Sequence, residues 1–186
     1  MESVAGTLLS GLAVFAATNV DGLFITAALL SARPTRARDV VLGTYAGIGA
    51  LYAVSAAGSL VSLLLPPSAI ALLGLIPLGL GVRQLLRRDV EAETPAGHGV
   101  LAVAGINVAA GGDNIGVYTP LFAASPGYAI GLYGVVFAVL TGLLCYAAHR
   151  LVSHPALGAP VRRYGPRAVP WVLIALGLWI LADGLA

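Results

Sequence analysis

Charge is scarce in this chain, and its scarcity excludes most classes of soluble protein. Only 10% of the 186 residues are charged and 59% are hydrophobic, whereas a soluble domain has about 25% charged residues. The net charge of +2 is too small, and too scattered, to suggest a nucleic-acid partner. The composition therefore predicts an all-α integral membrane protein whose main partner is the lipid bilayer.

Cysteine is nearly absent, and lysine is absent altogether. The single cysteine, Cys145, excludes an intramolecular disulfide and any C-x-x-C metal or redox motif, and no cofactor is expected. All ten basic residues are arginine, and none precedes the first apolar run. That run is too long, and too polar at its centre, for a cleaved signal peptide. We expect it to be a retained membrane span.

Six apolar runs have roughly the 20 residues that a transmembrane helix needs. They cover about 4–31, 39–64, 68–86, 99–123, 128–150 and 169–184. Turn-forming residues separate several of them, among them Pro66-Pro67-Ser68 and Ser125-Pro126-Gly127. The sequence therefore predicts six transmembrane helices in a single transmembrane domain over residues 1–186.

The arginines predict the orientation of these spans. They occur in or beside the loops between spans 1 and 2, 3 and 4, and 5 and 6, at positions Arg33, Arg36, Arg38, Arg83, Arg87, Arg88, Arg150, Arg162, Arg163 and Arg167. The other two loops have none. Basic loops stay in the cytoplasm, so both termini are expected outside the cell.

The two halves of the chain resemble each other. Asp21 and Asp113 lie 92 positions apart, in similar settings of small and amide residues. The predicted division is a first repeat over about 1–86, a cytoplasmic linker over about 87–98 and a second repeat over about 99–186. Because each repeat has an odd number of spans, the two copies must be inverted, which is a common plan of transporters.

Two acidic side chains interrupt runs that should lie in lipid. Asp21 lies within Val4–Leu30 and Asp113 within Val100–Ala124, while the other six acidic residues fall in loops or at ends. A carboxylate at the centre of the bilayer costs roughly 2.5–3.5 kcal/mol, and such residues mark functional sites. No arginine is available at mid-span to pair with either acid.

Oxygen-bearing side chains surround both acids. Thr18 and Asn19 precede Asp21, and Asn114 follows Asp113. Gly111-Gly112 should loosen the helix before the second acid, and Pro120 removes the hydrogen bond of the Gly116 carbonyl. Carboxylates, neutral oxygens and freed carbonyls suit a cation. The candidate metal ligands are therefore Asp21, Asp113, Asn114, Asn19 and Thr18.

Several of these residues also have a structural interpretation. Asn19 and Asn114 could hydrogen-bond between helices, and Thr18 could bond to its own backbone. Cys145 is the only soft ligand, but a lone membrane cysteine usually packs. Tyr45 is expected to pack as well. Three G-x-x-x-G spacings, at Gly43–Gly47, Gly112–Gly116 and Gly127–Gly131, are candidates for close helix contacts.

Several segments resemble the cadmium resistance transporter family (CadD type) of the lysine-exporter superfamily. The matching segments are Ala17–Asp21, Gly43–Gly47, Gly74–Gly81, Gly111–Tyr118, Leu144–Tyr146 and Tyr164–Pro170. The resemblance implies export of Cd²⁺, or of Zn²⁺, across a bacterial cytoplasmic membrane by a multi-pass protein. It also implies that Asp21 and the pair Asp113-Asn114 form the ion-binding centre. Asn19 carries over less directly, because family members vary there.

The expected mechanism is alternating access around a site between spans 1 and 4. Metal binding requires deprotonated carboxylates, so protons compete with the metal and proton antiport follows. A homodimer is compatible with the sequence, but nothing in the sequence requires one. No enzyme activity is expected.

Three alternatives remain open. The first is an exporter of amino acids or other small cations, and the second is a membrane partner protein without transport. The third is an intramembrane aspartyl protease, although the segment 110–113 lacks the first glycine of the G-x-G-D motif.

Overall fold

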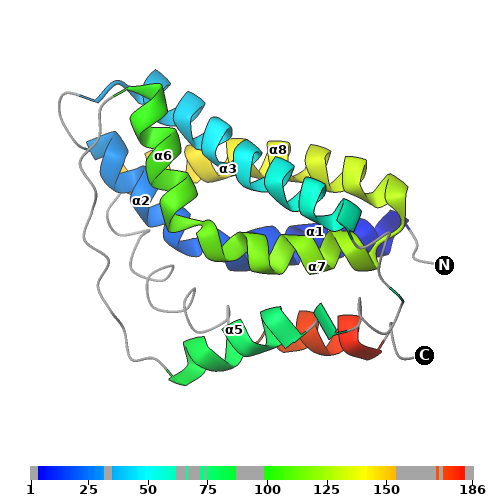
Figure 1. Cartoon of the computed structure of the whole chain (residues 1–186). Coiled ribbons are helices and arrows are strands. Elements are labelled where there is room, and N and C mark those ends of the chain that lie inside the picture. Colours follow the sequence, from blue (N-terminus) through cyan, green and yellow to red (C-terminus); the bar gives the residue numbers. More distant parts are fainter. Residues whose placement is uncertain are drawn as a thin grey trace.

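The chain folds into a bundle of helices, shown in Figure 1. The computed structural model describes residues 4–31, 35–61, 66, 72–73, 75–86, 99–153, 171 and 174–182. Its elements are α1 (Val4–Thr18), α2 (Val20–Ser31), α3 (Ala37–Leu60), α5 (Leu75–Leu86), α6 (Val100–Ala110), the short 3-10 helix η2 (Gly112–Asn114), α7 (Ile115–Ala124) and α8 (Gly127–Ser153). Residues 174–182 are helical as well.

Two to four of the six predicted spans correspond to helices that are long and apolar enough to cross a membrane. Within the described residues, α3 and α8 each meet this test alone, and two bent pairs of helices meet it if each pair is one span. The pair α1 and α2 bends by 56°, and α6 bends by 55° relative to Gly112–Ala124. The described parts of the third and sixth predicted spans, α5 and 174–182, are shorter than a full span, so a count of six stays a prediction.

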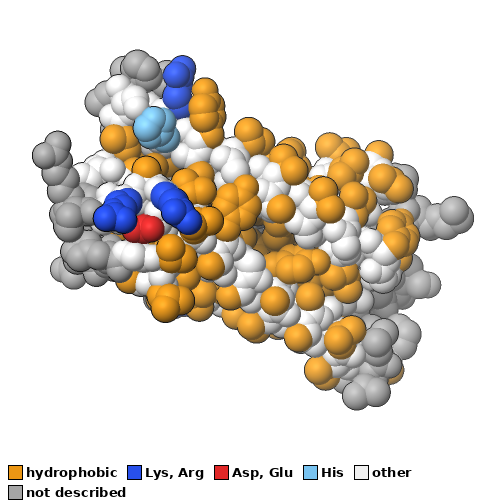
Figure 2. Space-filling model, turned by 90° about the horizontal axis from the view of Figure 1, so that it is seen from above, with side chains coloured by type: hydrophobic (Ala, Val, Ile, Leu, Met, Phe, Trp, Pro, Cys, Tyr) orange, Lys and Arg blue, Asp and Glu red, His pale blue; other side chains and the backbone are white. Residues whose placement is uncertain are grey.

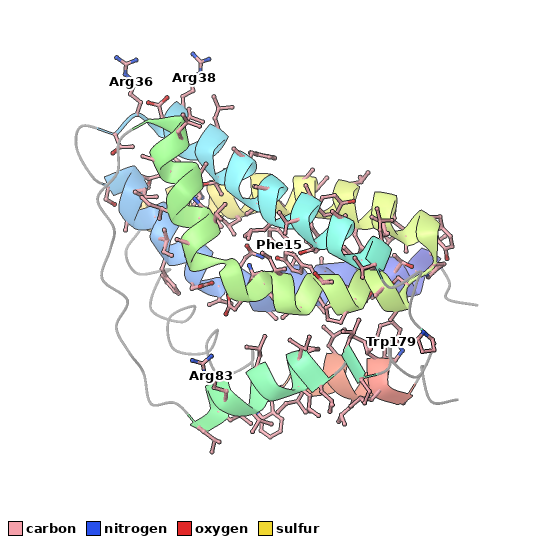
Figure 3. All side chains as sticks on the ribbon, viewed as in Figure 1. Phe15, Arg36, Arg38, Arg83 and Trp179 are labelled. Atoms are coloured by element: carbon pink, nitrogen blue, oxygen red, sulfur yellow. The ribbon has the colours of Figure 1, made fainter. Side chains whose placement is uncertain are left out.

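The described arginines lie at one end of the bundle. Arg36, Arg38 and Arg83 are at the same end in Figure 3, and Figure 2 shows the basic side chains gathered there. The opposite end carries the start of α1 and the end of the 174–182 helix (Figure 1). The predicted orientation requires the arginines at the cytoplasmic end of the bundle and the chain termini at the other end. The predicted linker 87–98 and the arginines beyond Arg150 lie outside the described residues.

The long straight helices pack on the broken ones in a reciprocal way. α3, from the first half of the chain, packs on both α6 and α7 of the second half. α8, from the second half, packs on both α1 and α2 of the first half. Each broken span is therefore held by the straight helix of the other half, and the two bends face each other across the interior.

An aromatic cluster joins the two halves. Phe137 of α8 lies 4.8 Å from Tyr118 of α7 and 5.3 Å from Phe15 of α1, measured between ring centroids. Tyr52 of α3 and Phe122 of α7 extend the cluster, with centroids 5.4 Å apart. Aromatic rings bury large areas and favour these edge-on and tilted contacts, so the cluster fixes α1, α3, α7 and α8 relative to one another.

The outward faces of the helices are apolar. On α8, Val135, Val139 and Leu143 are more than half exposed, and Figure 2 shows hydrophobic side chains spread over the visible surface. A soluble monomer rarely exposes apolar area on this scale, whereas the hydrocarbon core of a bilayer favours it. The exposed surface therefore fits a membrane-embedded protein.

One of the three G-x-x-x-G spacings makes a close helix contact through both of its glycines. A Cβ at Gly43 would lie 2.5 Å from the Cβ of Val103, and a Cβ at Gly47 would lie 2.6 Å from that of Asn107. Small residues at these positions let α3 and α6 approach closely. By contrast, open space surrounds Gly127 and Gly131, so that spacing does not pack helices within the described residues.

Gly47→Ala is expected to destabilise the bundle by about 1–3 kcal/mol, the usual cost of overpacking a core. The new methyl group would meet the Ala104 carbonyl oxygen at 2.9 Å, and a backbone atom in a helix moves little. Gly49→Ala is the matched control on the same helix, because nothing lies within 4 Å of its Cβ. Thermal unfolding in detergent measures the difference, and equal melting temperatures for the two variants would contradict this packing.

Candidate metal centre

The first bend is centred on Asn19, the only residue between α1 and α2. The Thr18 hydroxyl donates to the Val14 carbonyl oxygen at 2.9 Å, and the Asn19 amide nitrogen donates to that of Phe15 at 3.0 Å. Side-chain bonds to carbonyls of the preceding turn compete with the helix and bend it. This explains a sharp bend that has neither proline nor glycine at its centre.

The second bend follows from glycine, as the sequence predicts. α6 ends at Ala110, Gly111 is a turn, and Gly112–Asn114 form a single 3-10 turn. A Cβ at Gly111 would lie 2.6 Å from a terminal methyl carbon of Leu51 and 3.1 Å from the Asn107 carbonyl oxygen, so the lack of a side chain lets this turn pack closely against α3. Pro120 lies inside α7 without ending it.

Tyr118 links the two bends. Its hydroxyl lies 2.9 Å from the Thr18 hydroxyl oxygen and accepts a hydrogen bond from the Asn19 amide nitrogen at 2.9 Å. The side chain has no exposed surface. Tyr118 belongs to the first turn of α7, directly after the second bend, so one phenol hydroxyl joins polar groups from both halves of the chain.

A small polar cavity lies between the bends. It has a volume of about 10 Å³, which is room for about one water-sized occupant. The residues that line it come from both broken spans and from α3, and they are Thr18, Asn19, Asp21, Gly22, Ile48, Leu51, Asn107, Ala110, Gly111 and Asn114. Three amides, one carboxylate and one hydroxyl therefore surround a space that fits a single ion.

Two of the amides have their nitrogen atoms committed to the backbone. The Asn19 nitrogen donates to the Phe15 carbonyl oxygen, and the Asn107 nitrogen donates to that of Val103 at 2.9 Å. A carbonyl only accepts, so the nitrogen must face it and the side-chain oxygen must turn away. Neither amide oxygen makes a hydrogen bond to another described residue. Such oxygens can bind a cation.

The carboxylates occupy equivalent places in the two bends. Asp21 lies in the first turn of α2 and Asp113 in η2, at the start of the second half of its span. Helix N-termini attract negative charge, and here each is taken by an acid of the protein itself. Both side chains are exposed. Asp21 lines the cavity, whereas Asp113 does not.

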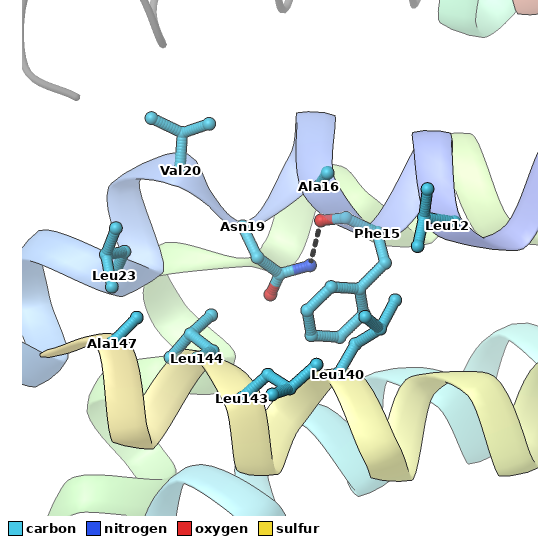
Figure 4. A pocket seen from close by; sticks show the side chains of 10 residues that line it. All are labelled: Leu12, Phe15, Ala16, Asn19, Val20, Leu23, Leu140, Leu143, Leu144 and Ala147. Carbon is cyan, nitrogen blue, oxygen red and sulfur yellow. Dashed lines mark hydrogen bonds between the residues drawn. The ribbon is translucent and has the colours of Figure 1, made fainter. Parts of the chain in front are cut away.

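An apolar pocket adjoins the first bend, between α1, α2 and α8. Its volume is about 380 Å³, and apart from Asn19 it is lined by hydrophobic side chains, drawn in Figure 4. The figure shows the Asn19 nitrogen turned to the Phe15 carbonyl and the side-chain oxygen on the other side. Asn19 thus lies at the boundary between the polar cavity and this pocket.

The structure places the predicted site residues in different relations to the cavity. Thr18, Asn19, Asp21 and Asn114 line it together. Asp113 lies nearby in the second bend but outside the lining. Thr18 also bonds to its own backbone, as the structural interpretation expects.

Two polar residues at the site are not predicted from the sequence. Asn107 lines the cavity, and its only signal is an amide in the middle of an apolar run. In the sequence, Tyr118 looks like an aromatic core residue. Only the fold shows that its hydroxyl lies at the first bend.

Two other residues lie away from the cavity. The Tyr45 hydroxyl donates to the Ala138 carbonyl oxygen at 3.0 Å, which confirms a packing role for this side chain between α3 and α8. Cys145 is buried on α8, against Thr44 of α3. It is not among the residues that line the cavity, so the soft thiol does not contribute to this arrangement of ligands.

Comparison with known proteins gives one match. The model of a family described as "Cadmium resistance transporter" matches residues 15–185, which is nearly the whole chain and includes both bends. No curated protein and no solved structure matches this chain.

Proposed function

The chain belongs to the cadmium resistance transporter family, and from this premise we propose that it exports Cd²⁺, with Zn²⁺ as a second substrate, across the cytoplasmic membrane in exchange for protons. Family membership and the apolar helices make it a multi-pass membrane transporter of metal ions. The identity of the ion, the proton exchange and the two-aspartate site are the parts that we propose. Membership in a transporter family also argues against the protease alternative.

The observation that carries this proposal is the composition of the cavity between the two bends. Every polar side chain that lines it offers oxygen, and the nitrogens of Asn19 and Asn107 are held by backbone carbonyls. A space of about 10 Å³ holds one ion and excludes an amino acid. The geometry therefore favours a metal cation over the organic substrates that the sequence leaves open.

Hard oxygen ligands around a soft ion make weak binding, and weak binding suits transport. Cd²⁺ prefers thiolate, yet the only cysteine lies outside the cavity. An exporter must release its ion on the far side in every cycle, so tight coordination by sulfur would slow it. We infer that the site selects by charge and size, and that Zn²⁺ therefore competes with Cd²⁺.

The reciprocal packing of the helices supports alternating access between inverted repeats. α3 packs on the broken span of the second half and α8 on that of the first, as expected for two units related by a pseudo-two-fold axis in the membrane plane. In our proposal the two halves rock around the cavity. Asp21 and Asp113 neutralise the ion, while Asn19, Asn107, Asn114 and Thr18 complete its coordination.

A metal-sensitivity assay tests the function directly. A bacterial host that lacks its own exporters is grown with Cd²⁺, Zn²⁺, Mn²⁺ or Co²⁺, with and without this protein. We expect the protein to restore growth most strongly in Cd²⁺, and to lower the metal content of the cells. Unchanged cellular content for all four metals, with the protein present in the membrane, would overturn the proposal.

Asn107→Val is expected to weaken metal transport, raising KM for Cd²⁺ by about 5- to 20-fold, because one charge-assisted ligand contact is lost. The fold should persist, since the Asn107 side-chain bond stays within its own helix. Thr141→Val is the matched control: it removes a similar bond to the Phe137 carbonyl oxygen, on α8. Uptake into proteoliposomes measures both variants, and equal KM values would exclude Asn107 from the site.

A further inference from the structure

We propose that Tyr118 is a positioning residue of the metal site, which orients the Asn19 amide so that its oxygen is left for the ion. This inference rests on the proposed function. It assigns a role to a residue that does not itself line the cavity. Tyr118 acts from α7, in the half of the chain that does not contain Asn19.

The hydrogen-bond network around the first bend joins Thr18, Asn19 and Tyr118. The Thr18 hydroxyl has one hydrogen, which goes to the Val14 carbonyl oxygen at 2.9 Å. The Tyr118 hydroxyl must then donate to the Thr18 oxygen, at 2.9 Å. The Tyr118 hydroxyl oxygen is the nearest acceptor for the Asn19 nitrogen, at 2.9 Å, and the Phe15 carbonyl oxygen and the Thr18 hydroxyl oxygen each lie at 3.0 Å.

In this arrangement the Asn19 side-chain oxygen has no hydrogen-bond donor among the described residues. With both hydrogens of the Asn19 nitrogen committed, the Asn19 side-chain oxygen makes no hydrogen bond to a described residue, although the residue is only 7% exposed. An acceptor oxygen that no described group uses can take a ligand. Tyr118 thus keeps the amide in the orientation that presents oxygen to a cation.

The same hydroxyl also joins the two halves of the site. Thr18 and Asn19 belong to the first bend, whereas Tyr118 follows the second bend by one turn. The tyrosine ring is fixed by packing, at 4.8 Å from Phe137 and 6.2 Å from Phe122 between centroids. A ring fixed by packing therefore presents one hydroxyl to Thr18 and Asn19 of the first bend.

The test is Tyr118→Phe in the full-length protein, with Cd²⁺ uptake measured in proteoliposomes. The ring and its packing remain, so the fold should remain. We expect KM for Cd²⁺ to rise by about 3- to 10-fold, as for the loss of a typical hydrogen bond, with kcat changed by less than about twofold. Tyr133→Phe is the matched control: Tyr133 is equally buried, and its hydroxyl meets those of Ser10 and Ser125 at 3.0 and 3.2 Å.

A double-mutant cycle separates positioning from general stability. If Tyr118 acts through Asn19, the substitution should alter KM by less than about twofold in an Asn19→Ala background, because residues that act as one unit are not additive. Full additivity, an unchanged KM in Tyr118→Phe, or an equal rise in Tyr133→Phe would each overturn the inference while wild-type transport stands. Absence of divalent-metal transport by the wild type would overturn the proposed function, and this inference with it.

Discussion

Asp21→Asn is expected to abolish metal export, lowering kcat/KM for Cd²⁺ by about 100-fold or more. The loss of a charge-assisted contact to the ion costs up to about 3 kcal/mol, and each 1.4 kcal/mol is a factor of ten. Asparagine has nearly the same shape as aspartate, so the first bend should be retained. The effect is therefore one of charge, and uptake into proteoliposomes measures it.

Asp113→Asn should cause a similar loss, although Asp113 does not line the cavity. In our account both carboxylates neutralise the same divalent ion, and each bend contributes one. Asp39→Asn is a suitable control, because this acid lies in the first turn of α3, after Arg36. Transport by Asp113→Asn at the wild-type rate would reduce the site to a single acid and contradict the symmetric arrangement.

Metal export should depend steeply on pH, with opposite signs on the two sides of the membrane. Protons compete with metal for carboxylates. Acid on the loading side should raise KM for Cd²⁺, by up to about tenfold per pH unit if one proton competes. Acid on the release side should instead accelerate transport, because protonation of Asp21 and Asp113 expels the ion. Flux from metal-loaded proteoliposomes, measured against a series of pH gradients, checks both signs.

A protonophore provides the control for this experiment. It removes the pH gradient without touching the protein, so flux against a metal gradient should stop while downhill exchange continues. The carboxylate variants should lose the pH dependence together with the transport. A metal flux that does not change with the pH on either side of the membrane would contradict proton exchange. It would not contradict metal binding in the cavity.

The acids of the site could be predicted from the sequence because a charge within an apolar run is conspicuous. Asp21 and Asp113 stand out for this reason, and Gly111-Gly112 signals the second bend by its chemistry. The first bend could not be predicted in the same way. It results from Thr18 and Asn19 bonding to carbonyls of the preceding turn, and a sequence does not reveal whether such side chains bend a helix or bond between helices.

The neutral residues of the proposed site could be identified only from the three-dimensional arrangement. Asn107 looks like any polar residue that joins helices, and its place in the cavity follows from the close contact of α3 with α6 at Gly43 and Gly47. Tyr118 looks like a core aromatic residue. Its hydroxyl reaches the first bend only because α7 begins directly after the second one.

The sequence alone also does not show which G-x-x-x-G spacing makes a close helix contact. With 24 glycines in the chain, a spacing of four arises often by chance, and the packing partner decides which spacing matters. Gly47 faces Asn107 and Ala104 of α6, whereas a Cβ at Gly127, Gly131 or Gly112 would meet nothing within 4 Å. The sequence supplies candidates for close contacts, and the fold selects among them.

The binding stoichiometry of Cd²⁺ tests most directly whether the two bends hold a single ion between them. Equilibrium dialysis of the purified protein should give one bound ion per chain. Either Asp21→Asn or Asp113→Asn alone should remove nearly all of this binding, since one ion needs both halves. Two ions per chain, with each substitution removing only one of them, would mean that the bends are separate sites and would contradict the account.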